Sequence, residues 1–223
     1  MRLRIALLTV LIALAILLGI RPLDRSDWIL ENVLIVLGLA FLWRTRNWLP
    51  LTDASVWLVF VFLVLHEVGA HYTYACVPYD RWFESLSGRT LNSVLGLERN
   101  HYDRLVHFLF GFLLAIPQRE LFLRVVRARG IASYWLPVQM TLSWSAIYEI
   151  VEWLSAEFFG GELGAAFLGT QGDEWDAQKD MALAGLGAVL SMCVLAAIHR
   201  RRGYDFQQRW LELRVPDFAR RFD

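Results

Sequence analysis

Six apolar segments separated by charged loops constrain the fold of this 223-residue chain more than any other feature of its sequence. A run of about 18 or more residues with few charges is long enough to cross a bilayer as a helix. Hydrophobic residues make up 57% of the chain, against about 45–50% in soluble globular proteins. The six segments are about 4–20, 28–43, 54–76, 101–117, 132–157 and 177–199. The sequence therefore predicts an all-α protein, a polytopic membrane helical bundle with about six transmembrane helices.

The first two segments differ from ordinary membrane spans. Arg2 and Arg4 give the first segment a positive start like that of a signal peptide, but no small-residue cleavage site precedes "GIRPLD". We therefore interpret this segment as a retained anchor. The second segment, "WILENVLIVLGLAFLW", is short and carries Glu31 and Asn32 near its start, so it needs either tilt or burial within protein to span.

Arginine is distributed unequally between the two sides of such a bundle. With six spans, one side carries the N-terminus, the 44–53 and 118–131 loops and the C-terminal tail, which together hold fifteen arginines against five in the opposite loops. Loops rich in Lys and Arg stay in the cytoplasm, so both termini are predicted to be cytoplasmic. Tryptophans near segment ends, such as Trp43 and Trp135, fit an aromatic belt at the membrane interface.

No internal repeat, Gly-rich phosphate loop or low-complexity linker divides the chain. We predict one integral membrane domain over residues 1–199 and a basic cytoplasmic tail over 200–223. The basic and aromatic residues of the tail suit an interfacial segment on an anionic leaflet. A stop-transfer charge cluster followed by a loosely ordered tail explains them equally well. Cys76 and Cys193 lie near the ends of different segments and are interpreted as packing residues.

Ionisable residues lie within or at the start of the last four segments, at helical spacing. Residues three or four apart share one face of a helix. The four sets are Glu67 and His71, Asp103 and His107, Glu149 and Glu152, and Asp173, Asp176 and Asp180. Tyr74 is expected to continue the face formed by Glu67 and His71, and His101 lies just above Asp103 and His107.

All four sets are predicted to lie at one depth in the membrane. Successive spans run in opposite directions, so residues late in the third and fifth segments meet residues early in the fourth and sixth. The other halves of these segments are almost free of acids and histidines. The sequence therefore predicts one polar cluster toward the outer, periplasmic side.

Placing these residues inside a membrane is costly, at roughly 2.5–3.5 kcal/mol for each charged side chain. Adjacent carboxylates also repel one another unless they are protonated or share a cation. A divalent metal removes this repulsion, and His with Asp or Glu suits zinc, iron or manganese, so we predict such a cofactor. Glu67 or Glu152 is expected to act as general base. The predicted metal ligands are His71, Asp103, His107, Glu149, Asp176 and Asp180.

Two known metal-binding patterns differ from this one. In "HEVGAH" the second histidine follows the first by five residues rather than four, which turns their side chains about 140° apart and excludes the zincin motif. Ferritin-like bundles offer an analogy, because carboxylates and Glu-x-x-His pairs from four helices meet in their core. The pairs in this chain have a different spacing, Glu67-x-x-x-His71 and Asp103-x-x-x-His107.

Four motifs carry a resemblance to a known family. The segments "HEVGAHYTY", "RNHYDRLVHFLFGFLL", "YEIVEW" and "GTQGDEWDAQKDM" together resemble the bacterial inner-membrane family typified by YjdF. The resemblance covers roughly residues 55–195, and the last motif is the most specific. It implies a multi-pass protein of the bacterial inner membrane and points to these four segments, but it implies no particular reaction.

Several of these residues also have structural interpretations. His66 faces away from the polar stripe of its own segment and could hydrogen-bond a neighbouring helix. Asp173 could cap the sixth helix. Glu149 and Glu152 could share a proton as a carboxyl pair instead of binding a metal. Whether His66, His101 and Asp173 belong to the site stays open at this point.

The surroundings of the cluster allow two interpretations as well. Arg104 and Lys179 are the cations nearest to it and could serve only to balance its charge. The 77–100 loop, which contains Trp82, could form a lid over the site or could only join two helices.

Three functions from different classes follow from this pattern. We favour a membrane-embedded, metal-dependent hydrolase or transferase that acts on a lipid-like substrate. A transporter for protons or divalent cations would use the same carboxylates as a relay and would need a polar path to the cytoplasm, of which the sequence shows little sign. A non-catalytic scaffold would use the cluster to fix helix packing. The chain has no basic groove pattern for nucleic acid, so its expected partners are the lipid bilayer and the lipid-like substrate.

Overall fold

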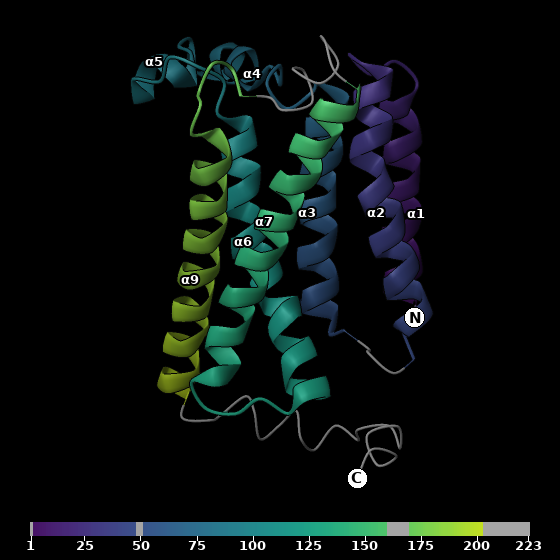
Figure 1. Ribbon diagram of the computed structural model, residues 1–223, viewed down its shortest axis with the longest axis vertical. Helices are drawn as coiled ribbons and strands as arrows, with labels where there is room; N and C mark the ends of the chain where they lie inside the picture. The colour runs from purple at the N-terminus through teal and green to yellow at the C-terminus, as the bar shows by residue number, and fades with distance from the viewer. Residues whose placement is uncertain (1, 48–50, 160–169, 203–223) are drawn as a thin grey trace.

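Helices form all of the regular structure in the computed structural model, which describes residues 2–47, 51–159 and 170–202 (Figure 1). The long helices are α1 (Arg2–Gly19), α2 (Arg25–Thr45), α3 (Asp53–His71), α6 (Tyr102–Leu121), α7 (Ala132–Phe159) and α9 (Asp176–Arg202). These six helices coincide with the six apolar segments, which confirms the all-α helical bundle. By length and hydropathy α1, α2, α3 and α9 qualify as membrane spans, whereas the count of six spans and the cytoplasmic termini remain predictions.

Helices α6 and α9 make the closest contact in the bundle. Gly111 of α6 lies against the backbone of Ala184, and Gly187 of α9 lies against the backbone of Phe108, so that a methyl group at either glycine would collide with a carbonyl. Small residues let membrane helices approach until their backbones touch. This approach places the first turns of α6 and α9 side by side, where the polar residues lie.

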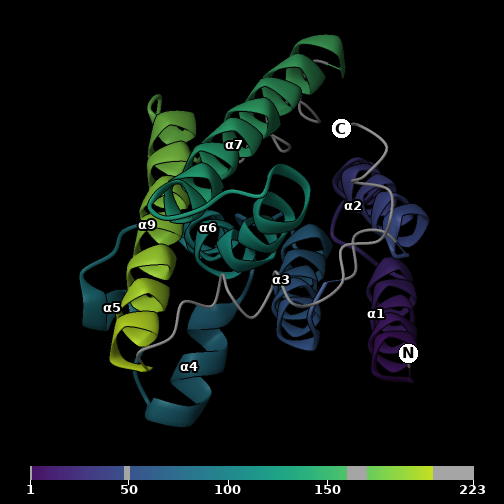
Figure 2. The same ribbon diagram turned by 90° about the horizontal axis from the view of Figure 1, so that it is seen from below.

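The other long helices surround this pair. Helix α7 packs against both α6 and α9, and α3 packs against α6 on the other side (Figure 2). Helix α1 contacts α3, and α2 packs against α3 next to it. The bundle thus has α6 near its centre, with α1 and α2 at one edge.

Two short helices, α4 (Tyr79–Ser87) and α5 (Leu91–Leu95), lie across one end of the bundle (Figure 1). We call this pair the cap. The first turn of α1 and the last turn of α9 lie at the opposite end. This agrees with termini on one side of the membrane. The predicted basic tail lies, from residue 203 on, outside the described residues.

Helix α3 ends at His71 and does not continue to residue 76 as the apolar segment predicted. Thr73 and Tyr74 have φ angles of 54° and 51°, in the left-handed region, which stops the helix. The turn returns the Tyr74 ring onto Gly69, and the Tyr74 hydroxyl lies 2.5 Å from His66 Nδ1. The prediction that Tyr74 continues the face of Glu67 is therefore wrong.

Helix α6 extends past Pro117 and passes into a π-helix, η1 (Phe122–Val126), so Pro117 lies inside the helix and not at its end. The added turn buries Glu120, which is acidic, at the end of the bundle opposite the cap. Its carboxylate accepts hydrogen bonds from the Thr52 backbone N–H at 2.9 Å and from the Ser55 hydroxyl at 2.6 Å. This half of the bundle is therefore less apolar than the sequence indicated.

Candidate functional site

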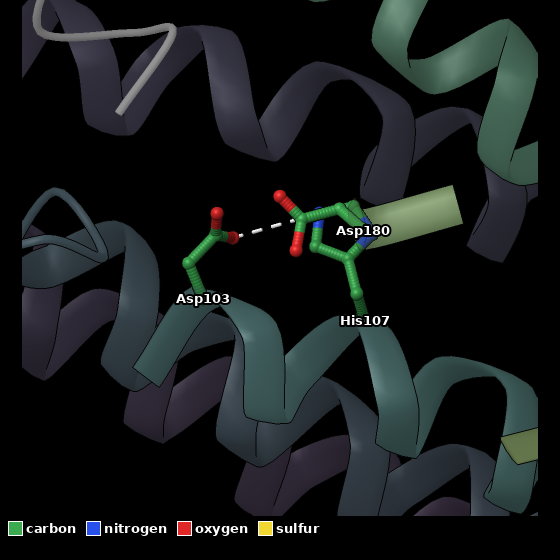
Figure 3. A group of neighbouring side chains, drawn as sticks. All are labelled: Asp103, His107 and Asp180. Carbon is green, nitrogen blue, oxygen red and sulfur yellow. Dashed lines mark ion pairs between the residues drawn. The ribbon is translucent and has the colours of Figure 1, made fainter. Parts of the chain in front are cut away.

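Asp103, His107 and Asp180 meet near the cap end of the bundle (Figure 3). One ligand atom from each residue lies within 4.8 Å of the others, and His107 Nε2 is 3.5 Å from Asp103 Oδ1. Asp103 and His107 are four residues apart on α6 and therefore share a face, while Asp180 lies in the second turn of α9. We call these three residues the metal-ligand group, because His and carboxylate oxygens are common metal ligands.

Two members of the metal-ligand group, His107 and Asp180, are buried, and Asp103 is half-buried. His107 has 9% of its surface exposed and Asp180 has 2%. A carboxylate removed from water needs a hydrogen-bond partner, a cation or a proton. Asp180 Oδ1 is buried without a hydrogen-bond partner in the described structure, and so is Glu149 Oε1. These two oxygens are the partners that a cation at this place would use, so the residues present fit a divalent metal.

Helix α7 adds a fourth candidate ligand. Glu149 Oε1 lies 3.8 Å from His107 Nε2, on the side of the imidazole that faces α7. The carboxyl of Glu152, one turn further along, contacts that of Glu149. Glu149 thus lies beside the metal-ligand group and Glu152 lies beside Glu149, and both the shared-proton and the ligand interpretations still apply to them.

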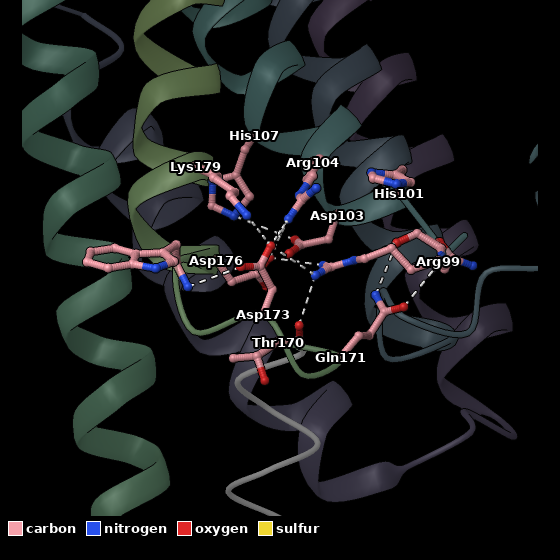
Figure 4. A network of polar contacts seen from close by, with 12 residues as sticks. Arg99, His101, Asp103, Arg104, His107, Thr170, Gln171, Asp173, Asp176 and Lys179 are labelled. Atoms are coloured by element: carbon pink, nitrogen blue, oxygen red, sulfur yellow. Dashed lines mark hydrogen bonds and ion pairs between the residues drawn. The ribbon is translucent and has the colours of Figure 1, made fainter. Parts of the chain in front are cut away.

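Three cations lie on the cap side of the metal-ligand group and bind two other carboxylates (Figure 4). Arg99 and Arg104 each place a guanidinium nitrogen near Asp176 Oδ1, at 3.0 and 3.1 Å. Arg104 also contacts Asp173 at 2.5 Å, and Lys179 contacts it at 2.6 Å. Asp176, which the sequence suggested as a ligand, therefore holds two arginines instead, and the structure does not include it in the metal-ligand group.

We call Arg99, Arg104 and Lys179 the cationic layer. Asp173 binds this layer and does not cap a helix. Helix α9 begins at Asp176, while the Asp173 carboxylate accepts a hydrogen bond from the Trp175 N–H at 3.1 Å. The hydrogen bond from Lys179 is the main cause that lowers the pKa of Asp173 to about 2. Arg104 and Lys179 thus do balance charge, and they do so on Asp173 and Asp176. The metal-ligand group keeps an excess of carboxylates.

Helix α3 directs its polar pair toward α1 and α2, away from the metal-ligand group. His71 Nδ1 lies 2.8 Å from the Leu18 carbonyl oxygen, and the Glu67 carboxyl lies beside Trp28 and Asn32. The face of α3 that packs on α6 carries other residues, and the Tyr102 hydroxyl of α6 donates to the Leu65 carbonyl there at 2.8 Å. The predicted convergence of four helical pairs therefore holds for α6, α7 and α9 but not for His71 and Glu67.

His66 and His101 also lie apart from the metal-ligand group. His66 is buried, and its partners are the Tyr74 hydroxyl in the turn after its own helix and the Glu31 backbone of the neighbouring helix α2. His101 lies just before the first residue of α6, and its backbone N–H donates to the Tyr79 hydroxyl at 2.9 Å. Figure 4 shows its ring turned away from Asp103 and His107.

Glu31 and Tyr148 extend the polar network beyond the site residues predicted from the sequence. The Tyr148 hydroxyl donates to Glu31 Oε2 at 2.8 Å, and the Tyr148 ring packs edge-on against the His107 imidazole with 5.9 Å between ring centroids. Asp27 and Glu31 are both buried and lie four residues apart on α2. That spacing, the same as in the Asp103–His107 pair, was the signal that could have found them.

Comparison with known proteins agrees with the membrane assignment. The family model described as "Predicted membrane protein (DUF2238)" matches residues 3–201. The chain is similar to the inner membrane protein YjdF of Escherichia coli (strain K12), at 37% identity over 186 residues, which cover 82% of this chain and 84% of the relative. No solved structure matches the chain significantly. The resemblance inferred from the four motifs is confirmed, and the chain belongs to the DUF2238 family of predicted membrane proteins.

Proposed function

We propose that this integral membrane protein is a metal-dependent hydrolase or transferase that acts on a lipid-like substrate in the bacterial inner membrane. The observation that carries the proposal is the convergence of Asp103, His107 and Asp180, whose ligand atoms lie within 4.8 Å of one another, with His107 and Asp180 buried. Without a cation or a proton, two carboxylates would lie together there at a high energetic cost. The membrane location rests on the apolar helices and on the relative YjdF, an inner membrane protein of Escherichia coli.

The ligand set favours zinc, iron or manganese. One imidazole with two carboxylates leaves at least one coordination position open for Glu149 or for a substrate atom. When bound, such a cation lowers the pKa of water and polarises a carbonyl or phosphoryl oxygen. A site of this kind supports hydrolysis or group transfer.

Glu152 is the residue that we assign as general base. It lies one helical turn from Glu149, and the carboxyl groups of the two residues are in contact. A carboxylate beside the ligand group, but outside it, can accept the proton of an attacking water. Glu67, the other residue expected in this role, lies against α2 and is a weaker candidate.

Metal content tests the proposal. We expect protein purified without chelator to hold about one divalent ion per chain, and His107→Ala and Asp180→Asn to lose most of it. His71→Ala is the matched control, because His71 bonds the Leu18 carbonyl and lies outside the group, so it should keep its metal. Absence of metal from wild-type protein after loading, or equal loss in all three variants, would contradict the proposal.

A second candidate function is transport of protons or divalent cations. Buried polar side chains continue along α7 away from the metal-ligand group, first at Ser145 and then at Thr141, which donates to Gln118 of α6 at 3.1 Å. This is the start of the polar path that a transporter needs. Flux into proteoliposomes would be abolished by Asp180→Asn and kept by Ser143→Ala, whose hydroxyl bonds its own helix at Gln139.

A further inference from the structure

Helix α4 of the cap is strongly amphipathic. Its apolar residues Tyr79, Trp82, Phe83 and Leu86 are spaced i, i+3, i+4 and i+7, which places them on one face of a helix. Its charged and hydroxyl residues occupy the opposite face. A helix with this pattern needs an apolar surface along one side.

The protein covers only part of that apolar face. Near the start of α4, the Trp82 ring packs edge-on against Tyr72 with 6.1 Å between ring centroids. Further along, Leu86 is 89% exposed, and Trp82 itself is 46% exposed. In α5, Val94 and Leu95 are also exposed, the latter to 59%. The cap thus presents a row of large apolar side chains that no described residue covers.

The position of the cap indicates what covers these side chains. The cap lies where α3 ends at His71 and α6 begins at Tyr102, across the end of the long helices (Figure 1). Seen along the bundle in Figure 2, α4 projects outside the position of α6, on the side away from α7, so it extends outward from the bundle. The ends of spanning helices lie at the membrane interface. A helix that extends sideways at this level lies over lipid.

The cap is not a loose connection, because hydrogen bonds hold it together and the His101 backbone N–H at the start of α6 donates to the Tyr79 hydroxyl at 2.9 Å. The Tyr79 hydroxyl donates to Asn92 Oδ1 at 2.8 Å, which joins α4 to α5, and the Asn92 backbone N–H donates to Asp80 Oδ1 at 2.9 Å. The Asn100 side chain donates to the Val77 carbonyl at 2.8 Å and closes the segment at its base. The orientation of the exposed apolar row is therefore set by the fold.

We propose that the cap is an interfacial membrane-binding element, whose residues Trp82, Leu86, Val94 and Leu95 insert at the headgroup and acyl boundary of the leaflet at this end of the bundle. Amphipathic helices with an apolar face of this kind lie in the plane of the interface. Tryptophan is enriched at that level, and the exposed Arg81 and Arg89 can reach lipid phosphates. The occupant of the apolar row is lipid and not a second copy of the chain.

This inference does not depend on the proposed enzyme activity, but it connects the leaflet to the site. The Asn92 side chain donates to the Arg99 carbonyl at 3.0 Å, and the Arg99 guanidinium holds Asp176. Insertion of the cap into the interface therefore fixes the position of Arg99 beside the metal-ligand group.

A polarity-sensitive fluorophore tests the proposal in the full chain, reconstituted in phosphatidylcholine and phosphatidylglycerol vesicles. Cys76 and Cys193, both exposed, are first replaced by serine, and Leu86→Cys is then labelled. Glu84→Cys is the matched control, because Glu84 lies on the opposite face of the same helix. We expect blue-shifted emission at position 86, severalfold stronger quenching by lipids brominated near the headgroup than at position 84, and protection from aqueous iodide.

Two results would overturn the proposal. Equal iodide quenching at both positions would show that the apolar row faces water. Protection at position 86 that brominated lipids do not quench, together with Leu86→Cys disulfide dimers at high protein-to-lipid ratio, would identify a second copy as the occupant. Metal content and thermal unfolding of each labelled variant are compared with those of the cysteine-free protein, so that misfolding is recognised separately.

Discussion

At the scale of single residues, the polar network depends on a few hydrogen bonds that connect helices far apart in the sequence. The bond from Tyr148 to Glu31 joins α7 to α2, and the same tyrosine ring packs on His107. A buried acceptor that loses its donor costs about 1–3 kcal/mol. The Tyr148 hydroxyl therefore contributes to holding α7 against α2.

Tyr148→Phe should therefore destabilise the protein by about 1–3 kcal/mol, because it leaves Glu31 Oε2 without its donor. Thermal unfolding in detergent measures the effect. Tyr72→Phe is the control, since the described contacts of Tyr72 are with rings and not through its hydroxyl, and it should change stability little. An equal change in thermal stability for the two variants would show that the hydrogen bond from Tyr148 to Glu31 does not stabilise the protein.

Asp173 makes stability depend on pH in the acid range. Its pKa is lowered to about 2, chiefly by the hydrogen bond from Lys179, whereas an aspartate in the unfolded chain titrates near pH 3.9. The ionised group therefore stabilises the fold at pH values above about 4, and this contribution is lost as pH falls toward 2.

The stability difference between wild type and Asp173→Asn should be constant above about pH 4 and should shrink as pH falls toward 2. Thermal unfolding in detergent over this range measures it. A difference that stays constant down to pH 2 would contradict the role assigned to the Lys179 bond.

At the scale of helices, the close contact of α6 and α9 brings the metal-ligand group together. Gly111→Ala would place a methyl group against the Ala184 carbonyl and force the helices apart. We expect a loss of about 1–3 kcal/mol and reduced metal content. Gly38→Ala in α2 is the control, because nothing lies within 4 Å of the added methyl. It should leave metal content unchanged and raise stability by up to about 1 kcal/mol. Unchanged metal content in Gly111→Ala would contradict this account.

The helices were predictable from sequence because their signal is local. The lengths of the apolar segments predict all six long helices, and the i, i+4 spacing predicts that Asp103 and His107 form a pair. The direction in which a helix face points is not local. The spacing alone predicts that all four pairs face inward together. In α3, however, the Leu65 carbonyl accepts the hydrogen bond from Tyr102 of α6, while His71 lies against the Leu18 carbonyl of α1. The left-handed turn at Thr73 and Tyr74 could not be predicted from the sequence either, since neither residue is a glycine.

At the scale of the whole molecule, the candidate site lies at one end of the bundle. The cap, the cationic layer and the metal-ligand group lie together there, while α1 begins and α9 ends at the other end. The excess of arginine at that other end predicts that it faces the cytoplasm. The site would then open toward the periplasm.

Reporter fusions test this orientation. Green fluorescent protein fused after the last residue of the chain should fluoresce, and alkaline phosphatase at the same place should be inactive. Alkaline phosphatase fused after Ser87, at the end of α4, should be active. The reverse pattern would place the metal-ligand group on the cytoplasmic side.

The central claim is that Asp103, His107 and Asp180 hold a divalent metal. X-ray absorption spectroscopy of zinc-loaded protein tests it most directly, because it reports the atoms bound to the ion. We expect a first shell of oxygens with a single imidazole, at about 2.0–2.2 Å, and loss of the imidazole signal in His107→Ala. A shell with sulfur or several imidazoles, or an imidazole signal unchanged in His107→Ala, would contradict it.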